Sequence, residues 1–123
     1  MNNATPELPL VMVVEDELLI AATLEMALES HGYGILGPVA TVDEALTLLA
    51  TSRPDMALID YRLASTTTEA LLQPLQELRV PVCVLTGYSR QQLPAGYADC
   101  AMLEKPFRMK ELLAALARLN TVF

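Results

Sequence analysis

Five polar residues lie at the ends of short apolar runs, and their types together could carry out phosphoryl chemistry. The acidic pair Glu15 and Asp16 follows one run, while Asp60, Thr86 and Lys105 follow three others. Three neighbouring carboxylates repel one another unless a cation offsets them, and an all-oxygen ligand set suits Mg²⁺ or Mn²⁺. A lysine ammonium and a threonine hydroxyl could bind an anion held on that metal. Phosphoryl transfer to a carboxylate requires this combination of groups.

The apolar runs predict the strands that bring these residues together. Runs this short and continuous are typical of strands buried on both faces, and the Gly37-Pro38 pair in the weakest run suits an edge strand. The expected strands are Leu10 to Val14, Gly34 to Ala40, Met56 to Ile59, Pro81 to Leu85 and Ala101 to Leu103. Because the carboxyl ends of parallel strands share one edge of a sheet, the polar residues should meet there.

Helical patterns alternate with these strands. Asp16 or Glu17 can cap a first helix that ends near Gly32, and Thr41 with Glu44 forms a capping-box pattern that opens a second helix. The order of elements predicts an α/β fold, a flavodoxin-like (βα)5 three-layer sandwich whose five parallel strands lie in the order 2-1-3-4-5.

The second half of the chain is less regular. Pro74 either kinks a third helix or marks the start of its regular part. Residues 87–100 contain two glycines and a proline and show poor helical periodicity, so the fourth helix should be short or irregular. Met109 to Leu119 predicts the last helix, with leucines on one face.

Length and composition indicate one domain with a substantial core. The chain has 123 residues, of which 53% are hydrophobic and 19% charged, and we expect a tail at 1–8 followed by one domain at 9–123. A formal net charge of −7 without a basic cluster argues against nucleic-acid binding. The sequence has neither a signal peptide nor an apolar stretch of transmembrane length, so we expect a cytoplasmic location without membrane contact.

Each candidate site residue also has a plainer explanation when taken alone. Glu15 and Asp16 could belong to a helix cap, Asp60 could end a strand before a turn, Thr86 could start an ordinary turn, and Lys105 could lie in a surface loop. Four such coincidences at one edge of a sheet are improbable. The sequence therefore favours a functional site.

Four motifs resemble the receiver domain of two-component response regulators. They are Val-Val-Glu-Asp-Glu at 13–17, Leu-Ile-Asp at 58–60, Leu-Thr-Gly at 85–87 and Glu-Lys-Pro-Phe at 104–107. The resemblance extends over residues 9 to 120 and is specific as a set. It implies a switch in a two-component system or phosphorelay, which accepts a phosphoryl group from a sensor histidine kinase or a histidine phosphotransfer protein.

The resemblance also implies a role for each site residue. Asp60 would be the phosphoryl acceptor and a metal ligand. Asp16 would bind Mg²⁺ directly, Glu15 through water, and Arg62 through its main-chain carbonyl. Thr86 and Lys105 would contact the phosphoryl oxygens. Without an output domain in the sequence, output is expected through an unknown downstream protein or by onward phosphotransfer.

Three features depart from the usual receiver pattern. Met102 occupies the position of the family's switch aromatic, and Lys105 follows Thr86 by only 19 positions. The segment Pro81 to Tyr88 resembles the "FAT GUY" group of single-domain receivers, although valines replace that motif's aromatic residues. We hypothesise that Tyr88 takes over the switching role.

Alternative functions fit the residues less well. A phosphohydrolase of the haloacid dehalogenase type needs a second aspartate two residues after the nucleophile, where this chain has Arg62. A pseudo-receiver, an interaction module that is not phosphorylated, would not need the complete acid, threonine and lysine set. A flavodoxin needs a phosphate loop after the first strand, where Glu15 and its acidic neighbours would repel phosphate. We therefore expect no enzymatic activity beyond catalysis of the chain's own phosphorylation and dephosphorylation.

Overall fold

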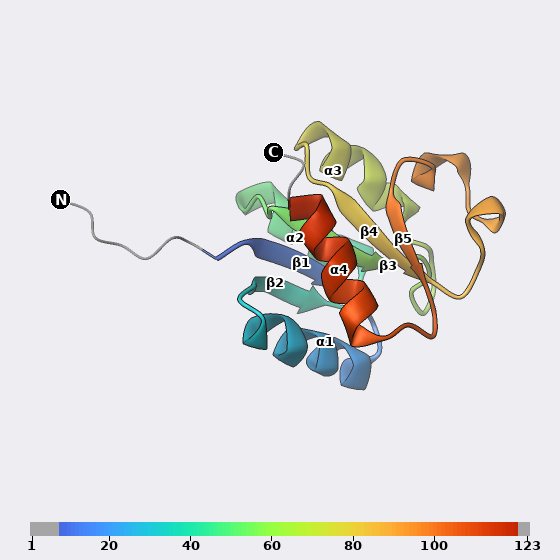
Figure 1. The fold of residues 1–123 in the computed structure, drawn as a ribbon. Helices are drawn as coiled ribbons and strands as arrows, with labels where there is room; N and C mark the ends of the chain where they lie inside the picture. Colours follow the sequence, from blue (N-terminus) through green and yellow to red (C-terminus); the bar gives the residue numbers. More distant parts are fainter. Residues whose placement is uncertain (1–7, 121–123) are drawn as a thin grey trace.

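Five parallel strands form the centre of the protein, in the order β2-β1-β3-β4-β5 (Figure 1). The computed structural model describes residues 8–120. The strands are β1 (Leu10–Val14), β2 (Gly34–Val39), β3 (Met56–Asp60), β4 (Val82–Thr86) and β5 (Ala101–Glu104). The predicted strand order and the five predicted strands are confirmed, each within one residue at either end.

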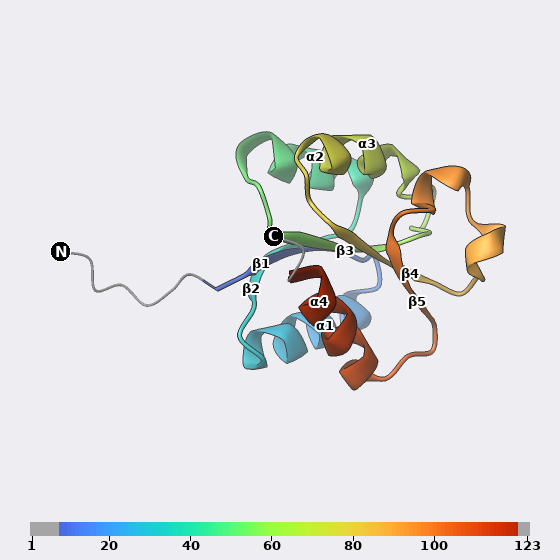
Figure 2. The same ribbon diagram turned by 45° about the horizontal axis from the view of Figure 1, so that its top comes forward.

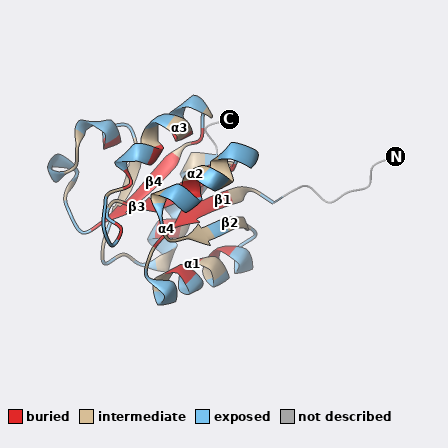
Figure 3. Cartoon of the chain, turned by 180° about the vertical axis from the view of Figure 1, so that it is seen from behind, coloured by how far each residue is buried: buried red, intermediate tan, exposed pale blue. Residues whose placement is uncertain are grey.

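The three central strands are buried along almost their whole length (Figure 3). All five residues of β3 and of β4 are buried, whereas the residues of the edge strand β2 are only partly buried or exposed. Strands covered by helices on both faces are expected to be apolar throughout. This explains why the continuous apolar runs were a reliable signal for β1, β3 and β4.

Two helices cover each face of the sheet, which gives the predicted three layers (Figure 2). The helices are α1 (Leu18–Ser30), α2 (Val42–Thr51), α3 (Leu72–Glu77) and α4 (Met109–Asn120). On one face Leu24 and Leu28 of α1 and Leu112 of α4 pack against Val11 and Val13. On the other face α2 and α3 pack against the intervening residues of β1, since successive strand residues point to opposite faces.

The predicted helix caps are formed with two differences. Thr41 caps α2 by accepting a hydrogen bond from the Glu44 amide at 3.1 Å, but the Glu44 carboxylate accepts from the Ala40 amide at 3.0 Å instead of from Thr41. Glu17 occupies the N-cap position of α1 without a side-chain capping bond. Gly32 follows the end of α1 with φ +91°, a conformation that suits glycine.

Pro74 lies in the first turn of α3, where a helix tolerates proline because the amides there have no partner inside the helix. A short 3₁₀ turn, η1 (Glu69–Leu71), precedes the helix. The regular part of this helix therefore begins close to Pro74, as one of the two alternatives predicted.

The connection between β4 and β5 contains no α-helix. Two 3₁₀ turns, η2 (Arg90–Gln92) and η3 (Ala95–Tyr97), take the place of a helix here. The prediction that the helix between the fourth and fifth strands is short or irregular is confirmed, and α4 is the helix that follows β5. The Arg90 guanidinium ties the segment together by donating to the main-chain oxygens of Ala98 and Cys100, both at 3.1 Å. We call residues 87–100 the β4–β5 segment.

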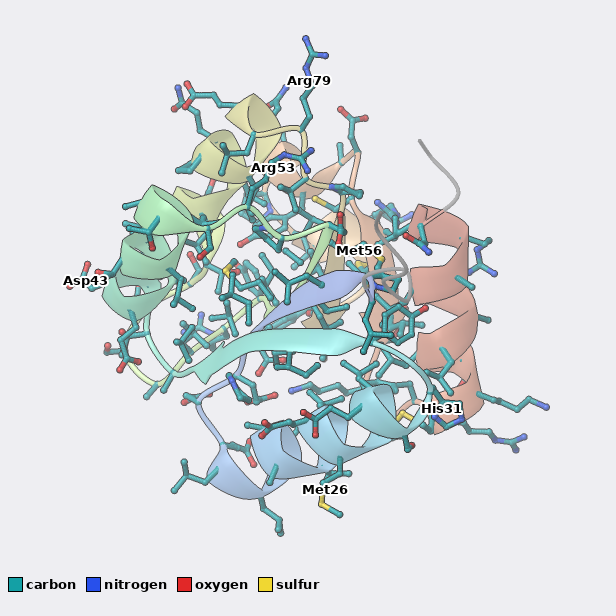
Figure 4. The ribbon with its side chains drawn as sticks, turned by 90° about the vertical axis from the view of Figure 1, so that its left-hand side faces the viewer. Met26, His31, Asp43, Arg53, Met56 and Arg79 are labelled. Atoms are coloured by element: carbon teal, nitrogen blue, oxygen red, sulfur yellow. The ribbon has the colours of Figure 1, made fainter. Side chains whose placement is uncertain are left out.

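Side chains on the outer helices point away from the body of the protein, as Met26 and Asp43 show, whereas Met56 points inward (Figure 4). His31 lies exposed at the end of α1, with Nδ1 2.8 Å from the Ala27 main-chain oxygen. None of the helices in residues 8–120 is long and apolar enough to cross a membrane. The predicted tail at 1–8 falls mostly on residues 1–7, which lie outside the described residues, so the domain boundaries remain a prediction.

Candidate functional site

The ends of β1 and β3 bring three carboxylates together. The strands pair in parallel with Val14 opposite Ile59, so the next residues, Glu15 and Asp60, face each other. A carboxylate oxygen from each of Glu15, Asp16 and Asp60 lies within 4.8 Å of the others. Glu15 and Asp60 are buried, while Asp16 is partly exposed. The acid cluster predicted from the sequence is therefore formed.

Lys105 reaches this cluster from the end of β5. Thr86 pairs with Glu104, and the Lys105 amide donates to the main-chain oxygen of Thr86 at 2.7 Å. This bond fixes the Lys105 backbone next to the end of β4. Its ammonium lies 3.2 Å from Asp60 Oδ1, 3.3 Å from Asp60 Oδ2 and 3.8 Å from Glu15 Oε1. Lys105 and Asp60 are thus in direct contact although they lie 45 positions apart in the sequence.

The charges of the cluster are not balanced by the lysine. The pKa of Asp60 is raised to about 8, first because burial removes water from its carboxylate, and then because the neighbouring Glu15 carboxylate disfavours a second negative charge beside it. Burial alone would lower the pKa of Lys105, but the attraction of Asp60 and Glu15 outweighs burial and raises that pKa. Lys105 is therefore a cation at neutral pH, and the cluster still favours a further positive charge.

Two buried oxygens of the cluster have only the Lys105 ammonium as a partner. Glu15 Oε1 and Asp60 Oδ1 form ion pairs with it, at 3.8 Å and 3.2 Å, but neither accepts a hydrogen bond of good geometry from the described residues. Glu15 is held in place by its other oxygen, which accepts from the Glu17 amide at 3.1 Å. A donor set made only of carboxylate oxygens suits Mg²⁺ or Mn²⁺, which would use the free lone pairs. The residues present therefore fit the expected cation.

The predicted switch residues lie at the end of β4, two residues beyond it, and in β5. Thr86 is buried, and its Oγ1 accepts from the Tyr88 amide at 2.9 Å, a bond that leaves the hydroxyl proton free for another acceptor. Tyr88 is 41% exposed, and its ring meets Tyr61 edge-on at 5.8 Å. Met102, in β5, is partly buried against the core on the α2 and α3 face. The structure thus brings Tyr88, but not Met102, into an aromatic contact.

Arg62 lies in the loop that follows Asp60. Its side chain is exposed, and its main chain forms an isolated antiparallel bridge with Thr67. The role of its carbonyl as a metal ligand remains a prediction.

Two residues near Asp60 were not predicted from the sequence. Thr68 is fully buried and donates to the main-chain oxygen of Asp60 at 2.6 Å, and its hydroxyl lies 2.9 Å from that of Tyr97. Thr68 belongs to the stretch after Asp60 for which the sequence predicts neither a helix nor a strand, and Tyr97 to the segment with the poorest helical periodicity. Three consecutive threonines at 66–68 offered no signal to single out the buried one.

Comparison with known proteins agrees with this geometry. The family model of the response regulator receiver domain matches residues 11–117. Among solved structures, the response regulator TrrA from Thermotoga maritima in complex with Mg²⁺-BeF superposes with a TM-score of 0.78 at 21% identity, covering 89% of this chain and 97% of that chain. At that identity the likeness shows the fold alone.

Two curated relatives are similar in sequence. The phyllosphere-induced regulator PhyR of Methylorubrum extorquens is 32% identical over 88% of this chain and 42% of its own length. The transcriptional regulatory protein PdtaR of Mycobacterium tuberculosis is 30% identical over 86% of this chain and 54% of its own length. The chain thus spans about half the length of these relatives. Its fold, acid cluster and family match together show that the chain belongs to the response regulator receiver domain family of two-component systems.

Proposed function

We propose that this receiver domain is a phosphorylation-dependent switch that accepts a phosphoryl group on Asp60 in a Mg²⁺-dependent reaction. The observation that carries the proposal is the contact between the Lys105 ammonium and the buried Asp60 carboxylate, within a cluster of three acids. The donor is a phosphohistidine, on a sensor histidine kinase or a histidine phosphotransfer protein.

The reaction needs only modest chemistry from the protein. A carboxylate oxygen of Asp60 attacks the phosphorus, a P–O bond forms, and the P–N bond to the donor imidazole breaks while the imidazole nitrogen takes up a proton. The Lys105 ammonium binds a phosphoryl oxygen and offsets its charge, and the Thr86 hydroxyl donates to another. Catalysis of this step and of the later hydrolysis is the extent of the proposed enzymatic activity, in keeping with a signalling domain.

The metal would be held by Asp16 and Asp60, by Glu15 through water, and by the main-chain carbonyl of Arg62. When bound, Mg²⁺ supplies charge neutralisation for the transferring group. The two buried oxygens on Glu15 and Asp60, whose one partner among the described residues is the Lys105 ammonium, support this assignment. The TrrA structure, which holds Mg²⁺ with a beryllofluoride group, is a receiver with the same fold.

The switch is proposed to run through Thr86 into the β4–β5 segment. A phosphoryl group that accepts a hydrogen bond from the Thr86 hydroxyl would draw that hydroxyl toward Asp60, which disturbs the bond from the Tyr88 amide. Tyr88 then takes the role of the family's aromatic residue, and Met102 at the usual position cannot. In a segment with two conformations, the added charge of the phosphoryl group shifts the equilibrium between them, and the exposed surface of the segment changes as a result.

Output is proposed through a downstream protein or by onward phosphotransfer, in the cytoplasm, without binding of nucleic acid or membrane. The net charge of −7 supports the exclusion of nucleic acid. The relatives are about twice as long as the matched region, so the activity of their remaining parts is not carried over to this chain.

Intact mass after incubation with acetyl phosphate and Mg²⁺ tests the proposal, with Asp60→Asn as the control. Gain of one phosphoryl mass in the wild type alone supports Asp60 as the acceptor, and loss of that gain when a chelator replaces Mg²⁺ supports the metal requirement. If neither acetyl phosphate nor a phosphorylated histidine phosphotransfer protein modifies the wild type, the domain is an interaction module and the proposal is wrong.

A further inference from the structure

One buried polar residue near Asp60 has no part in the proposed function. Among the described residues, four polar or charged side chains are buried: Glu15, Asp60, Thr68 and Thr86. Three of them have a proposed role at the acceptor. Thr68 is the fourth, with no exposed surface.

The hydrogen bonds of Thr68 have a fixed direction. Its Oγ1 lies 2.6 Å from the Asp60 main-chain oxygen, 3.3 Å from that of Tyr61 and 2.9 Å from the Tyr97 hydroxyl. Carbonyl oxygens only accept, so Thr68 donates its single proton to Asp60, the nearest carbonyl. Tyr97 must then donate its phenolic proton to Thr68. The result is one directed chain from Tyr97 through Thr68 to the acceptor residue.

Thr68 also closes the loop that follows the acceptor. Its amide donates to the main-chain oxygen of Tyr61 at 2.9 Å, and the Leu63 amide donates to the main-chain oxygen of Thr66 at 2.8 Å. Arg62 forms a β-bridge with Thr67. The loop thus turns back and returns to the end of β3. This loop carries the Arg62 carbonyl proposed as a metal ligand, so Thr68 sets both the end of β3 and the loop beside it.

Tyr97 ties the β4–β5 segment to the same point. It is 2% exposed, and its ring meets Tyr61 edge-on at 5.3 Å, while Tyr61 meets Tyr88 at 5.8 Å. Burial, the largest effect, raises the pKa of Tyr97 to about 12, so the phenol keeps the proton that it donates. The segment has no α-helix to hold it, and buried contacts of this kind therefore decide its conformation.

We propose that Thr68 is a positioning residue for Asp60, and that the Thr68–Tyr97 hydrogen bond couples the state of the acceptor to the conformation of the β4–β5 segment. This inference rests on the proposed function. The hydrogen bond from Thr68 to the Asp60 main-chain oxygen holds Asp60 in place. Through the hydrogen bond with Tyr97, a shift of the end of β3 changes the position of a residue 29 positions further along the chain.

A variant set separates positioning from simple support of the fold. Thr68→Val keeps the shape and removes the hydroxyl, Thr68→Ser restores the hydroxyl, and Tyr97→Phe removes only the phenolic donor. Thr66→Val is the matched control, because Thr66 is exposed on the same loop and its hydroxyl makes no hydrogen bond among the described residues. Circular dichroism establishes that each variant is folded.

Beryllofluoride with Mg²⁺ serves as the probe, since it stands in for the phosphoryl group without turnover. Its affinity is measured by calorimetry, and hydrogen exchange over residues 88–100 is measured with and without it. For Thr68→Val we expect an affinity about 3- to 10-fold lower, as one buried hydrogen bond is lost, and no exchange response in the segment. Thr68→Ser should restore both readouts.

Tyr97→Phe distinguishes the two halves of the proposal. It keeps the bond from Thr68 to Asp60, so its affinity should stay within about 2-fold of wild type while the exchange response of the segment is lost. Thr66→Val should match the wild type in both readouts.

The outcomes that overturn the inference differ from the failure of the proposed function. A wild type that binds no beryllofluoride overturns the proposed function and this inference with it. A wild type that binds, with Thr68→Val and Tyr97→Phe unchanged in affinity and exchange, overturns the inference alone. The inference is also overturned alone if Thr68→Val is unfolded while a folded Tyr97→Phe keeps the full exchange response.

Discussion

Lys105 and Asp60 form an ion pair in which the ammonium lies 3.2 Å from one carboxylate oxygen and 3.3 Å from the other. The lysine comes from the end of β5 and reaches past β4 to the end of β3. An ammonium in contact with both oxygens of a buried carboxylate is also close enough to stabilise the negative charge that develops on a phosphoryl group transferred to that carboxylate.

Replacement of Lys105 tests this relationship directly. In Lys105→Met we expect phosphorylation of Asp60 by acetyl phosphate to slow by about 10²-fold or more, because the charge on the transferring group is no longer offset. The measurement is the initial rate by intact mass. Lys110→Met is the matched control, since Lys110 is the other lysine of the chain and is exposed on α4. A rate within a few-fold of wild type would sink the proposed role.

The pKa of Asp60 makes the metal-free stability depend on pH. The carboxyl has an ordinary pKa of 3.8 and a pKa of about 8 in the folded chain, mainly because of burial. Between these values the folded state holds a proton that the unfolded state has released, so the free energy of unfolding should fall as pH rises from about 4 to about 8. Urea unfolding in the presence of a chelator measures it.

Asp60→Asn should remove that pH dependence and be more stable than the wild type at pH 8 by roughly 1–3 kcal/mol, because it keeps the buried shape without the charge. Asp43→Asn, an exposed aspartate on α2, should retain the wild-type slope. Parallel profiles for the wild type and Asp60→Asn would mean that Asp60 does not carry the extra proton.

Metal binding should stabilise the folded state. At 100 times the dissociation constant, Mg²⁺ should raise the free energy of unfolding by about 2.7 kcal/mol, which a thermal melt detects as a higher Tm. Asp16→Asn should lose most of this increase, since Asp16 belongs to the acid cluster, whereas Asp43→Asn should keep it. An equal rise in Tm for Asp16→Asn would show that the metal is bound elsewhere.

The Tyr88 ring, rather than its hydroxyl, should carry the switch. The ring meets Tyr61 edge-on, and no hydrogen bond of the Tyr88 hydroxyl is found among residues 8–120. We therefore expect Tyr88→Phe to keep the phosphorylation-dependent change in hydrogen exchange over residues 88–103, and Tyr88→Ala to lose it. Persistence of the change in Tyr88→Ala would return the switching role to some other group.

The parts of the site that lie at strand ends were predictable from the sequence, for a physical reason. Strands buried on both faces must be apolar throughout, so a polar residue such as Asp60 at the end of such a run is conspicuous. The parallel topology then fixes which strand ends share an edge: Val14 pairs with Ile59, and Glu15 and Asp60 are the residues that follow this pair.

Thr68 and Tyr97 could not be found in the same way. Their hydroxyls meet across 29 residues, between a loop and an irregular segment, and neither stretch has a periodicity that indicates which side chain is buried. The sequence did indicate that no regular helix forms between β4 and β5, because Gly87, Pro94 and Gly96 disfavour a helix there. It contained no information on the aromatic contacts that replace that helix.

The cluster of Tyr61, Tyr88 and Tyr97 has an optical consequence. The chain has four tyrosines and no tryptophan, so tyrosine dominates its intrinsic ultraviolet fluorescence. Three of the four tyrosine rings are in contact, because Tyr61 meets both Tyr88 and Tyr97 edge-on. Tyr33, the fourth, packs against the opposite core cluster. The protein therefore carries a built-in reporter whose emission should follow the state of Asp60 without any attached dye.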